Sequence, residues 1–480
     1  MPTRITILGA GPGGYVAAIR AAQLGAEVTL IEREKIGGTC LNWGCIPTKT
    51  LKTTADLLEN LRRAPELGVD LDGRVRLNMG RLMARKQEVI EAQATGILKI
   101  LKSYKVQYLQ GDGRVLDPSR VRVETAARGT MEVVSDRLIV ATGSRPMPIR
   151  AFPFDGKRIL SSSHALDLQE VPEAILIVGG GVIGCEFAFI FSSLGSRVIV
   201  VEALSRSIPL PSVDPDCSII LQREMKKRKI QFHLNRTVEA AEIVGDRVRV
   251  TIGPSPMAQG LKERDRQPVL EEVDRVLVCI GREPVTQGMG LESLGLETDP
   301  RGWLVANERM ETNVPKVYAI GDVLGPSKVM LAHVASAEGL VAVENGMGGD
   351  REMDYDAVPS AVFTSPEMAC VGLTEDQARE RGLGVKADTF LFRALGKAQA
   401  MGEIAGQVKV VADAHTGRII GVHMIGPHAT DLIAEGTLAI RMRATLDDVA
   451  STIHAHPTLS EALREVSSGQ LTGPNRIRGN

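Results

Sequence analysis

RITILGAGPGG, at residues 4–14, carries the strongest indication of the fold, and AILIVGGGVIG at residues 174–184 repeats its pattern. Each copy is a short run of β-branched residues, then Gly-x-Gly-x-x-Gly, then a helical stretch. A second strand comes next in each copy and ends at an acid, Glu32 or Glu202. This order of strand, glycine turn, helix and acid is the context of a dinucleotide-binding unit. The sequence therefore predicts an α/β protein with two Rossmann-like units built on one plan.

The glycines and acids of these units have predicted roles in binding. The first glycine permits a tight turn, the second lets the backbone approach a pyrophosphate at the helix N-terminus, and the third lets the helix pack on the sheet. The acid is expected to bind ribose hydroxyls and to repel a 2′-phosphate, so the second unit should prefer NAD, a preference that Arg206 weakens. Two matched copies weaken the alternative of purely structural turns. The residues are Gly9, Gly11, Gly14 and Glu32, and Gly179, Gly181, Gly184 and Glu202.

Further patterns divide the chain into four parts. LIVATGSRP at 138–146 resembles VLVCIGREP at 276–284, and a Pro-rich connector leads out of the first unit. The last part has no glycine fingerprint. It is predicted to contain a hairpin with its turn near Asp413–Gly417 and an amphipathic helix in ATDLIAEGTLAIRMR, and so to be a separate α+β domain. The expected parts are residues 1–150, 151–280, 281–350 and 351–480.

Composition argues against several classes of partner and location. The 480 residues carry a net charge of −1 and 3% aromatic residues, which disfavours a nucleic-acid partner. No apolar run approaches the roughly 20 residues that span a bilayer, so no membrane association is expected. An apolar strand at the N-terminus leaves no room for a signal peptide, which predicts a cytoplasmic location. Four cysteines stand alone and are interpreted as small buried side chains, namely Cys185, Cys217, Cys279 and Cys370.

The other two cysteines, Cys40 and Cys45, lie in GGTCLNWGCIPTK. They are not a zinc pair, because no second Cys/His pair has matching spacing. A regular helix would separate them by roughly 7.5 Å of rise, whereas a disulfide needs Cα atoms about 4.4–6.8 Å apart. The segment must therefore be irregular, which Gly44 and Pro47 allow. A helix N-terminus here, with Lys49 nearby, would lower a thiol pKa and favour a redox pair over two unrelated buried thiols.

The motifs together resemble the flavin disulfide reductases, the class I pyridine nucleotide-disulfide oxidoreductases, and among them the dihydrolipoamide dehydrogenases. The resemblance covers nearly the whole chain. One departure is Trp43, where the family usually has a small aliphatic residue. The motifs that carry the resemblance are GAGPGG with Glu32, GGTCLNWGCIPTK, ATG at 141–143, GGGVIG with Glu202, YAIGDV with Asp322, and HAHPTLSE at 454–461.

This resemblance implies an FAD-binding domain at residues 1–150, an NAD-binding domain at 151–280, a central part at 281–350 that completes the FAD site, and a homodimer interface at 351–480. Cys45 is implied to lie nearest the flavin, and Cys40 to exchange with substrate. The implied catalytic residues are Cys40, Cys45, Lys49, Glu186, His456 and Glu461. Further implied cofactor contacts are Thr39, Lys49, Gly113, Thr142, Gly143, Ser144, Glu186, Val238, Gly281, Asp322, Met330, Leu331, Ala332 and His333.

The implied reaction is oxidation of free or protein-bound dihydrolipoamide with reduction of NAD⁺, in which His456 of one subunit serves the site of the other. The implied partner is a lipoyl-bearing protein of a 2-oxoacid dehydrogenase or glycine cleavage complex. Thr458-x-x-Glu461 is also a capping box, so on the residues alone Glu461 is as much a helix cap as a catalytic group. His454 and His456 have no evident third metal ligand, so no metal is expected. Lys49 and Glu186 are otherwise ordinary surface charges.

Three rival functions make different predictions. A glutathione reductase should have basic residues in place of Glu202, and a mercuric reductase should have a cysteine pair near the C-terminus, where no cysteine comes after Cys370. A redox-silent flavoprotein that serves only as a structural subunit should have lost the cysteines or His456, and all three are present.

Overall fold

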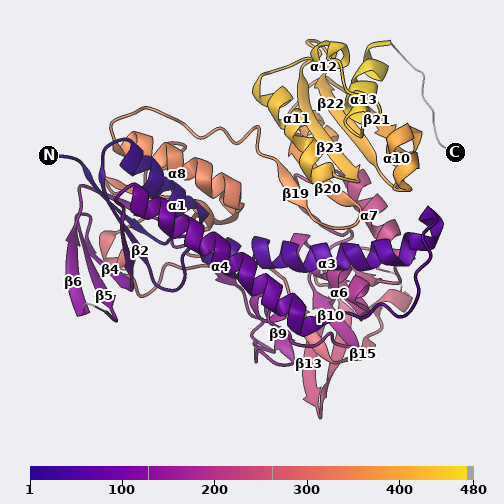
Figure 1. The fold of residues 1–480 in the computed structure, drawn as a ribbon, viewed down its shortest axis with the longest axis horizontal. Coiled ribbons are helices and arrows are strands. Elements are labelled where there is room, and N and C mark those ends of the chain that lie inside the picture. The colour runs from indigo at the N-terminus through magenta and orange to yellow at the C-terminus, as the bar shows by residue number, and fades with distance from the viewer. Residues whose placement is uncertain (128, 262, 473–480) are drawn as a thin grey trace.

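The computed structural model describes residues 1–127, 129–261 and 263–472. Two α/β units lie side by side, and two long helices, α3 (Cys45–Arg63) and α4 (Met79–Ser103), run from one to the other (Figure 1). The C-terminal domain, yellow in Figure 1, stands against the second unit. None of the helices in these described ranges has the length and apolar character needed to cross a bilayer.

The first unit is a parallel five-stranded sheet with the order β18-β7-β1-β2-β3. Its helix α1 (Pro12–Gln23) begins directly after the glycine turn, and α8 (Ala332–Gly346) packs beside α1. An antiparallel sheet of β4 (Asp112–Asp117), β5 (Arg120–Thr125) and β6 (Gly129–Val134) covers one side. The sheet strands are β1 (Arg4–Leu8), β2 (Glu27–Glu32), β3 (Gln107–Gln110), β7 (Arg137–Val140) and β18 (Val317–Ala319).

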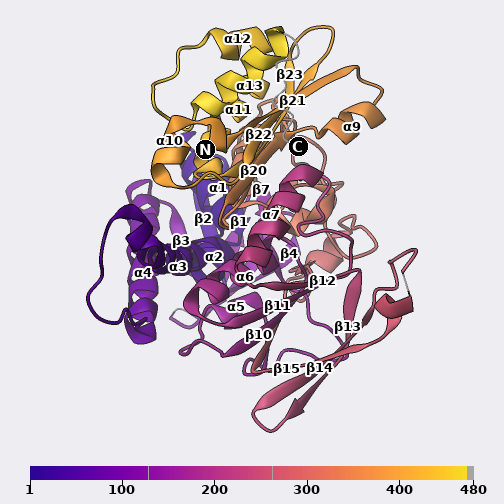
Figure 2. The ribbon, with the colours of Figure 1, turned by 90° about the vertical axis from the view of Figure 1, so that its right-hand side faces the viewer.

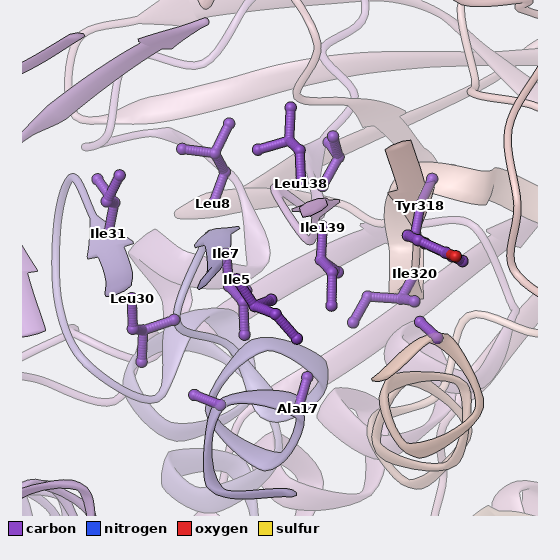
Figure 3. Packing of buried hydrophobic residues seen from close by; sticks show 14 of the residues in the cluster. Ile5, Ile7, Leu8, Ala17, Leu30, Ile31, Leu138, Ile139, Tyr318 and Ile320 are labelled. Atoms are coloured by element: carbon purple, nitrogen blue, oxygen red, sulfur yellow. The ribbon is translucent and has the colours of Figure 1, made fainter. Parts of the chain in front are cut away.

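The core of this unit explains how a distant part of the chain joins it. Ile5, Ile7 and Ile139 point from adjacent strands toward Ala17 of α1, and Ile320 lies among them (Figure 3). A parallel sheet covered on both faces needs strands that are buried and mainly apolar, and β1 and β7 are buried after their first residue, which is an arginine in each. Residues from Leu291 to Val343 belong to the same hydrophobic cluster. The part at 281–350 therefore shares the core of the first unit.

The second unit repeats the arrangement with the parallel order β12-β11-β10-β16-β9. A three-stranded antiparallel sheet, β13 (Arg236–Val244), β14 (Arg247–Pro254) and β15 (Val269–Val273), projects away from the rest of the molecule (Figure 2). Its parallel strands are β9 (Ile159–Leu160), β10 (Ala174–Val178), β11 (Arg197–Glu202), β12 (Gln231–Leu234) and β16 (Arg275–Val278), and its helices are α5 (Ser162–Ala165), α6 (Val182–Leu194) and α7 (Pro215–Lys227).

The two similar segments noted in the sequence pair with each other. The strand β8 (Ser144–Pro146) leaves the first unit after β7, and β17 (Arg282–Pro284) leaves the second unit after β16. They form an antiparallel ribbon in which Ser144 lies opposite Pro284 and Pro146 opposite Arg282. The segments that follow equivalent strands of the two sheets are thus hydrogen-bonded to each other as β8 and β17, which fixes the spacing between the two glycine motifs.

The C-terminal domain is an antiparallel sheet with the order β19-β20-β23-β22-β21. The predicted hairpin is β22 and β23, and the predicted amphipathic helix is α11, so both predictions are confirmed. The α/β class with two Rossmann-like units and an α+β C-terminal domain is confirmed as well. The elements are β19 (Ser360–Val362), β20 (Glu367–Gly372), β21 (Val385–Leu391), β22 (Gln407–Asp413), β23 (Ile419–Gly426), α9 (Glu375–Glu380), α10 (Gly396–Met401), α11 (Ala429–Arg441), α12 (Leu446–Ser451) and α13 (Glu461–Thr472).

Candidate active site

The cysteine pair lies at a break between two helices. The helix α2 (Gly38–Trp43) ends before Gly44, whose φ of −143° and ψ of −112° are not helical, and α3 begins at Cys45. This break brings the Cys40 and Cys45 thiols within hydrogen-bonding reach of each other. A Cβ on Gly44 would lie 3.0 Å from the Thr39 carbonyl oxygen, so a larger residue would strain the turn. The expected irregularity of the segment is confirmed.

The two sulfurs have different acidities. The thiol of Cys40 donates to Cys45, and this hydrogen bond is the largest cause that lowers the pKa of Cys45, to about 7. The positive charge of Lys49 lowers the same pKa further, while burial and the charge of Glu186 oppose the shift. The same hydrogen bond, together with burial, raises the pKa of Cys40. The reduced pair is therefore a thiolate at Cys45, at the N-terminus of α3, and a thiol at Cys40.

The ion pair of Lys49 and Glu186 lies close to the Cys45 thiolate and connects α3 with α6 of the second unit. Both oxygens of Glu186, in α6, accept from Lys49 Nζ at 2.9 and 3.0 Å. The Glu186 side chain is 7% exposed and also accepts from the backbone N–H of Phe363 at 3.0 Å. Lys49 Nζ lies 4.1 Å from the centre of the Phe363 ring. Lys49 and Glu186 therefore form a supported pair with a buried carboxylate and a half-buried ammonium group, which differs from the solvated surface charges of the alternative interpretation.

The glycine motifs have the geometry that a dinucleotide needs. A Cβ on Gly14 would lie 1.8 Å from the Gly9 carbonyl oxygen, so helix α1 packs against the turn only because Gly14 has no side chain. A Cβ on Gly11 or on Gly181 would meet no protein atom within 4 Å. These two positions face open space at a helix N-terminus, where backbone N–H groups attract an anion. The packing of the chain does not explain the absence of a side chain at these two positions, and the open space fits a ligand.

The acids at the ends of the second strands are held by the backbone. Glu202 accepts from the N–H groups of Gly180 at 2.7 Å and Leu204 at 2.9 Å. Glu32 is held in the same way by Ala10 at 2.7 Å and Glu34 at 2.8 Å. Burial raises the pKa of Glu32, and these two N–H groups oppose that shift. Each carboxylate keeps lone pairs for a ribose while its own position is fixed.

A polar network surrounds Asp322 where the two units meet. Ser144 Oγ donates to Asp322 Oδ2 at 2.6 Å, and Arg282 Nε donates to Ser144 Oγ at 2.6 Å. Burial is the largest influence on Arg282 and lowers its pKa, whereas Asp322 raises it. Thr142 Oγ1 is buried and has no hydrogen-bond partner among the described residues. An orphaned hydroxyl beside open space fits a polar group of a bound cofactor.

One cavity of about 2040 Å³ brings most of the predicted residues together. This volume exceeds the roughly 300–1,000 Å³ of a single small-ligand pocket. Trp43 lines it beside the cysteines, with Lys35 Nζ 5.8 Å from the centre of its ring. The predicted residues in its lining are Gly9, Gly11, Glu32, Thr39, Cys40, Cys45, Lys49, Gly113, Thr142, Gly143, Ser144, Gly179, Gly181, Glu186, Glu202, Gly281, Asp322, Met330, Leu331, Ala332 and His333.

Five predicted residues lie outside this lining. Gly14 and Gly184 pack against the glycine turns, as the third glycine of the motif should. Val238 is 7% exposed and its side chain packs in the core of the second unit, whereas its neighbour Thr237 lines the cavity. His456 and Glu461 stand in the C-terminal domain, and neither borders the cavity in which Cys40 and Cys45 of the same chain lie.

Glu461 contacts both of the groups that its two alternative roles require. Its Oε2 accepts from the backbone N–H of Thr458 at 2.9 Å, which is half of a capping box, and its Oε1 lies 3.0 Å from His456 Nδ1. The Thr458 hydrogen bond, followed by that of His456, lowers the pKa of Glu461. Because a carboxylate only accepts, Nδ1 carries the proton and Nε2 is left as the base. The His456 side chain is 78% exposed.

The metal alternative has no support in the described chain. His454 Nε2 lies 2.7 Å from Glu435 Oε1, and its Nδ1 lies 2.9 Å from the Thr452 carbonyl oxygen, so both ring nitrogens are engaged. The His454 side chain is 5% exposed, which fits a packed residue. Within residues 1–127, 129–261 and 263–472, no cluster of three His, Cys, Asp or Glu side chains is arranged to hold a metal ion.

Two residues of the site were missed from the sequence. Arg282 connects Ser144 with Asp322, and the available signal was its place in GREP at 281–284, which resembles GSRP at 143–146 and has Arg282 at the position of Ser144. Glu338 is 1% exposed and accepts from the Gly321 N–H at 2.6 Å, which fixes the backbone beside Asp322. The hydroxyl of Tyr355 donates to Glu338 at 2.7 Å. No local pattern marks Glu338, because its partners come from other segments.

The residues of this site lie in regions of the chain that models of one protein family match. A family model described as pyridine nucleotide-disulphide oxidoreductase matches residues 3–339, and the model of that family's dimerisation domain matches residues 358–467. The chain belongs to this family. Members of this oxidoreductase family use FAD and NAD(H). The resemblance inferred from the motifs is thereby confirmed.

Relatives of known name match along nearly the entire chain. The dihydrolipoyl dehydrogenase of Chlamydia trachomatis serovar D is 41% identical over 461 residues, covering 96% of this chain and 95% of its own. That of Bacillus subtilis is 42% identical over 475 residues, covering 96% and 97%. Among solved structures, LpdA of Mycobacterium tuberculosis has a TM-score of 0.88 and 30% identity, covering 98% of this chain and 100% of its own. RclA of Escherichia coli, a HOCl-induced flavoprotein disulfide reductase, has a TM-score of 0.82 and 26% identity, covering 97% and 99%.

Proposed function

We propose that this oxidoreductase is a dihydrolipoyl dehydrogenase, which oxidises dihydrolipoamide to lipoamide and reduces NAD⁺. The observation that carries the proposal is the position of the Cys40/Cys45 pair. It lies at a helix N-terminus, in one cavity with both glycine motifs and with the Lys49–Glu186 ion pair. The relatives named for this activity, 41–42% identical over nearly their full length, support the same conclusion.

The residues of each unit fit one of the two cofactors. The open face at Gly11, the carboxylate of Glu32 and the unpartnered hydroxyl of Thr142 would hold FAD. The open face at Gly181 and the carboxylate of Glu202 would hold NAD. When bound, FAD accepts two electrons from the dithiol and passes them to NAD⁺.

The protein's own groups handle the thiol chemistry. Cys45, with a pKa lowered to about 7, is the better leaving sulfur when the substrate thiolate attacks Cys40 in the disulfide form. Lys49 stabilises the thiolate that leaves. A base must take the proton of the substrate thiol before that thiol attacks, and Cys40, whose pKa in the reduced pair is raised, is released as a thiol and needs a proton back. His456, oriented through Nδ1 by Glu461, has a free Nε2 for that proton.

The base has to come from a second subunit. His456 does not border the cavity that holds the described Cys40 and Cys45 of its own chain, yet its ring is 78% exposed. A histidine that is oriented by a carboxylate and left open to solvent is suited to enter another chain's cavity. We therefore propose a homodimer in which His456 serves the partner's Cys40. The dimerisation-domain match at residues 358–467 supports this arrangement. A lipoyl-bearing protein as partner and a cytoplasmic location remain predictions.

Steady-state turnover tests the activity. We expect oxidation of free dihydrolipoamide with NAD⁺ and a much weaker rate with NADP⁺, because Glu202 stands where a 2′-phosphate would lie. Arg206 does not offset this charge, since its guanidinium donates to the carbonyls of Val213 and Leu210. Reduction of glutathione disulfide with NADPH, and no turnover of dihydrolipoamide, would overturn the proposal and favour the glutathione reductase rival.

Subunit mixing tests the dimer separately. The variants Cys45→Ser and His456→Gln should each be inactive, and mixing them under conditions of subunit exchange should restore about a quarter of the wild-type rate, since half of the dimers gain one complete site. If each site used its own chain's histidine, no complete site could form and the mixture would stay inactive. A mixture with Cys45→Ser and Glu186→Gln as the two variants is the matched control, because both residues lie in one chain's cavity.

A further inference from the structure

Two of the cysteines that were expected to stand alone lie together, which corrects the sequence interpretation. Cys217, in the first turn of α7, is fully buried, and Cys370, on β20, is 3% exposed. Their thiols hydrogen-bond to each other across the junction between the second unit and the C-terminal domain. Both also belong to one hydrophobic cluster that spans this junction. The structure thus holds a second pair of neighbouring cysteines that the electron path through Cys40 and Cys45 does not use.

A buried histidine faces this pair. His423, on β23, is the cross-strand neighbour of Cys370 and is fully buried. Its Nε2 lies 2.9 Å from the Leu373 carbonyl oxygen, so Nε2 carries a proton. Its Nδ1 makes no hydrogen bond among the described residues, and the neighbouring group whose charge acts most strongly on the ring is the Cys370 thiol on the adjacent strand. His423 is thereby set in the tautomer that accepts a proton from Cys370.

The pKa of one thiol of this pair is lowered and that of the other is raised, as in the Cys40/Cys45 pair. The hydrogen bond from Cys217, and after it the charge of His423, lower the pKa of Cys370 against the effect of burial. The hydrogen bond to Cys370, burial and the nearby Asp214 raise the pKa of Cys217. These contacts favour the thiolate at Cys370, which is also the one sulfur of the pair that borders the large cavity.

Charged groups hold α7, which carries Cys217, against the sheet that carries Cys370. Lys409, on β22, lies 3.0 Å from Asp214, 3.1 Å from Asp216 and 3.1 Å from Glu375. Asp214 caps the helix that carries Cys217 by accepting from the Asp216 N–H. Because Lys409 belongs to the C-terminal domain, this cluster fixes the start of α7 against the sheet that carries Cys370.

Access differs between the two thiols. Cys370 borders the large cavity, whereas Cys217 lies behind it with no exposed surface. A molecule small enough to pass from the cavity meets Cys370 first. The other two cysteines offer a contrast: buried Cys185 donates to the Gly180 carbonyl oxygen, Cys279 is partly buried, and burial raises the pKa of both.

We propose that Cys217 and Cys370 form a second redox-active dithiol, which a small hydroperoxide oxidises to a disulfide that ties the second unit to the C-terminal domain. The Cys370 thiolate attacks one peroxide oxygen, the O–O bond breaks, and Cys370 becomes a sulfenic acid. The leaving oxygen takes the proton from His423. The Cys217 thiol then attacks the Cys370 sulfur, the S–O bond breaks, and water leaves as the disulfide forms. The two thiols lose two electrons and two protons, and the hydroperoxide becomes an alcohol or water.

Peptide mapping of the holoenzyme tests this directly with hydrogen peroxide as the probe. Trypsin cleaves after Arg206 and Arg223 and after Arg351 and Arg379, so each of the two cysteines is released on a peptide with no other cysteine. After brief treatment, acid quenching and alkylation, we expect residues 207–223 and 352–379 joined by a bond that dithiothreitol breaks. The wild-type enzyme should also gain in Tm on oxidation, because the bond closes a long loop.

Three variants separate a redox site from ordinary packing. His423→Gln should slow formation of the joined peptide by about tenfold or more, since the proton acceptor is lost. Cys217→Ser should abolish the joined peptide and the gain in Tm, and dimedone should then label Cys370 as the sulfenic acid. Cys185→Ser, a change at an equally buried but unpaired cysteine, should leave the joined peptide unchanged. Full alkylation of Cys217 and Cys370 at peroxide doses that oxidise Cys40, or joining only after unfolding, would overturn the proposal.

Discussion

The two nucleotide-binding units have the same backbone plan and differ in the segment that comes after the second strand. A Cβ on the third glycine would lie 1.8 Å from a carbonyl oxygen in the first unit and 1.9 Å in the second, and each acid accepts a backbone N–H at 2.7 Å. After its second strand, however, the first unit continues into the cysteine-bearing α2 and α3, whereas the second continues into the loop of Arg206 and into α7. The shared plan thus fits a cofactor in each unit, and the segment after the second strand places the Cys40/Cys45 pair in the first unit only.

Loss of the Cys45 thiolate should have the largest effect on activity, and it tests whether the thiol chemistry of turnover depends on the first unit. Cys45→Ser should lower turnover of dihydrolipoamide with NAD⁺ by about a thousandfold or more, because the thiolate of the first unit is removed. Oxidation of NADH by ferricyanide should continue, since that route needs the cofactor sites and not the sulfurs. Cys185→Ser in the second unit is the matched control and should be close to wild type. Equal loss of both activities in Cys45→Ser would mean that the change damages the fold.

A matched pair of glycine changes separates the two cofactor sites and should have the next greatest effect. Gly181→Val should raise the KM for NAD⁺ by about a hundredfold and leave the flavin content unchanged, because a Cβ at this position points into open space, where it would meet the ligand before the protein. Gly11→Val should instead yield enzyme depleted of FAD, measured by visible absorbance per chain. Normal FAD binding in Gly11→Val would show that the first unit does not hold its cofactor at this turn.

Changes at Glu202 and Glu32, the acids at the ends of the second strands, should have a smaller effect on cofactor binding. Glu202→Gln should lower kcat/KM for NAD⁺ by about tenfold, because one amide N–H₂ would then face the N–H of Gly180 or Leu204 and the ribose acceptor would be displaced. Glu32→Gln should weaken FAD retention and leave the KM for NAD⁺ unaltered. If Glu202→Gln changed only flavin content, the assignment of the two units would be reversed.

The most modest effect is a shift in the acidity of Cys45. The pKa of this thiol is lowered to about 7, so its alkylation in the reduced enzyme should rise with pH through about 7 and not through its ordinary value near 9. Lys49→Met removes a positive charge that favours the thiolate, so the midpoint should move upward by about one unit. Lys52→Met, on the same helix but paired with Asp56, should not move it. An unchanged midpoint in Lys49→Met would show that the hydrogen bond from Cys40 acts alone.

Local sequence was enough to predict the two units, the redox pair and the hairpin, because each depends on residues close together in the chain. A glycine turn, an acid at the next strand end and two cysteines around Gly44 are set by local backbone geometry. The spacing of these residues can be recognised in the sequence without knowing how distant strands pair.

Contacts between segments far apart in the chain were settled by the tertiary fold alone. It joined β8 to β17, placed Arg282 between Ser144 and Asp322, and gave Glu338 its partners. It brought His423 beside Cys217 and Cys370, two cysteines that stand alone in the sequence. These contacts arise from sheet register and domain packing, where the neighbours of a side chain depend on the whole fold.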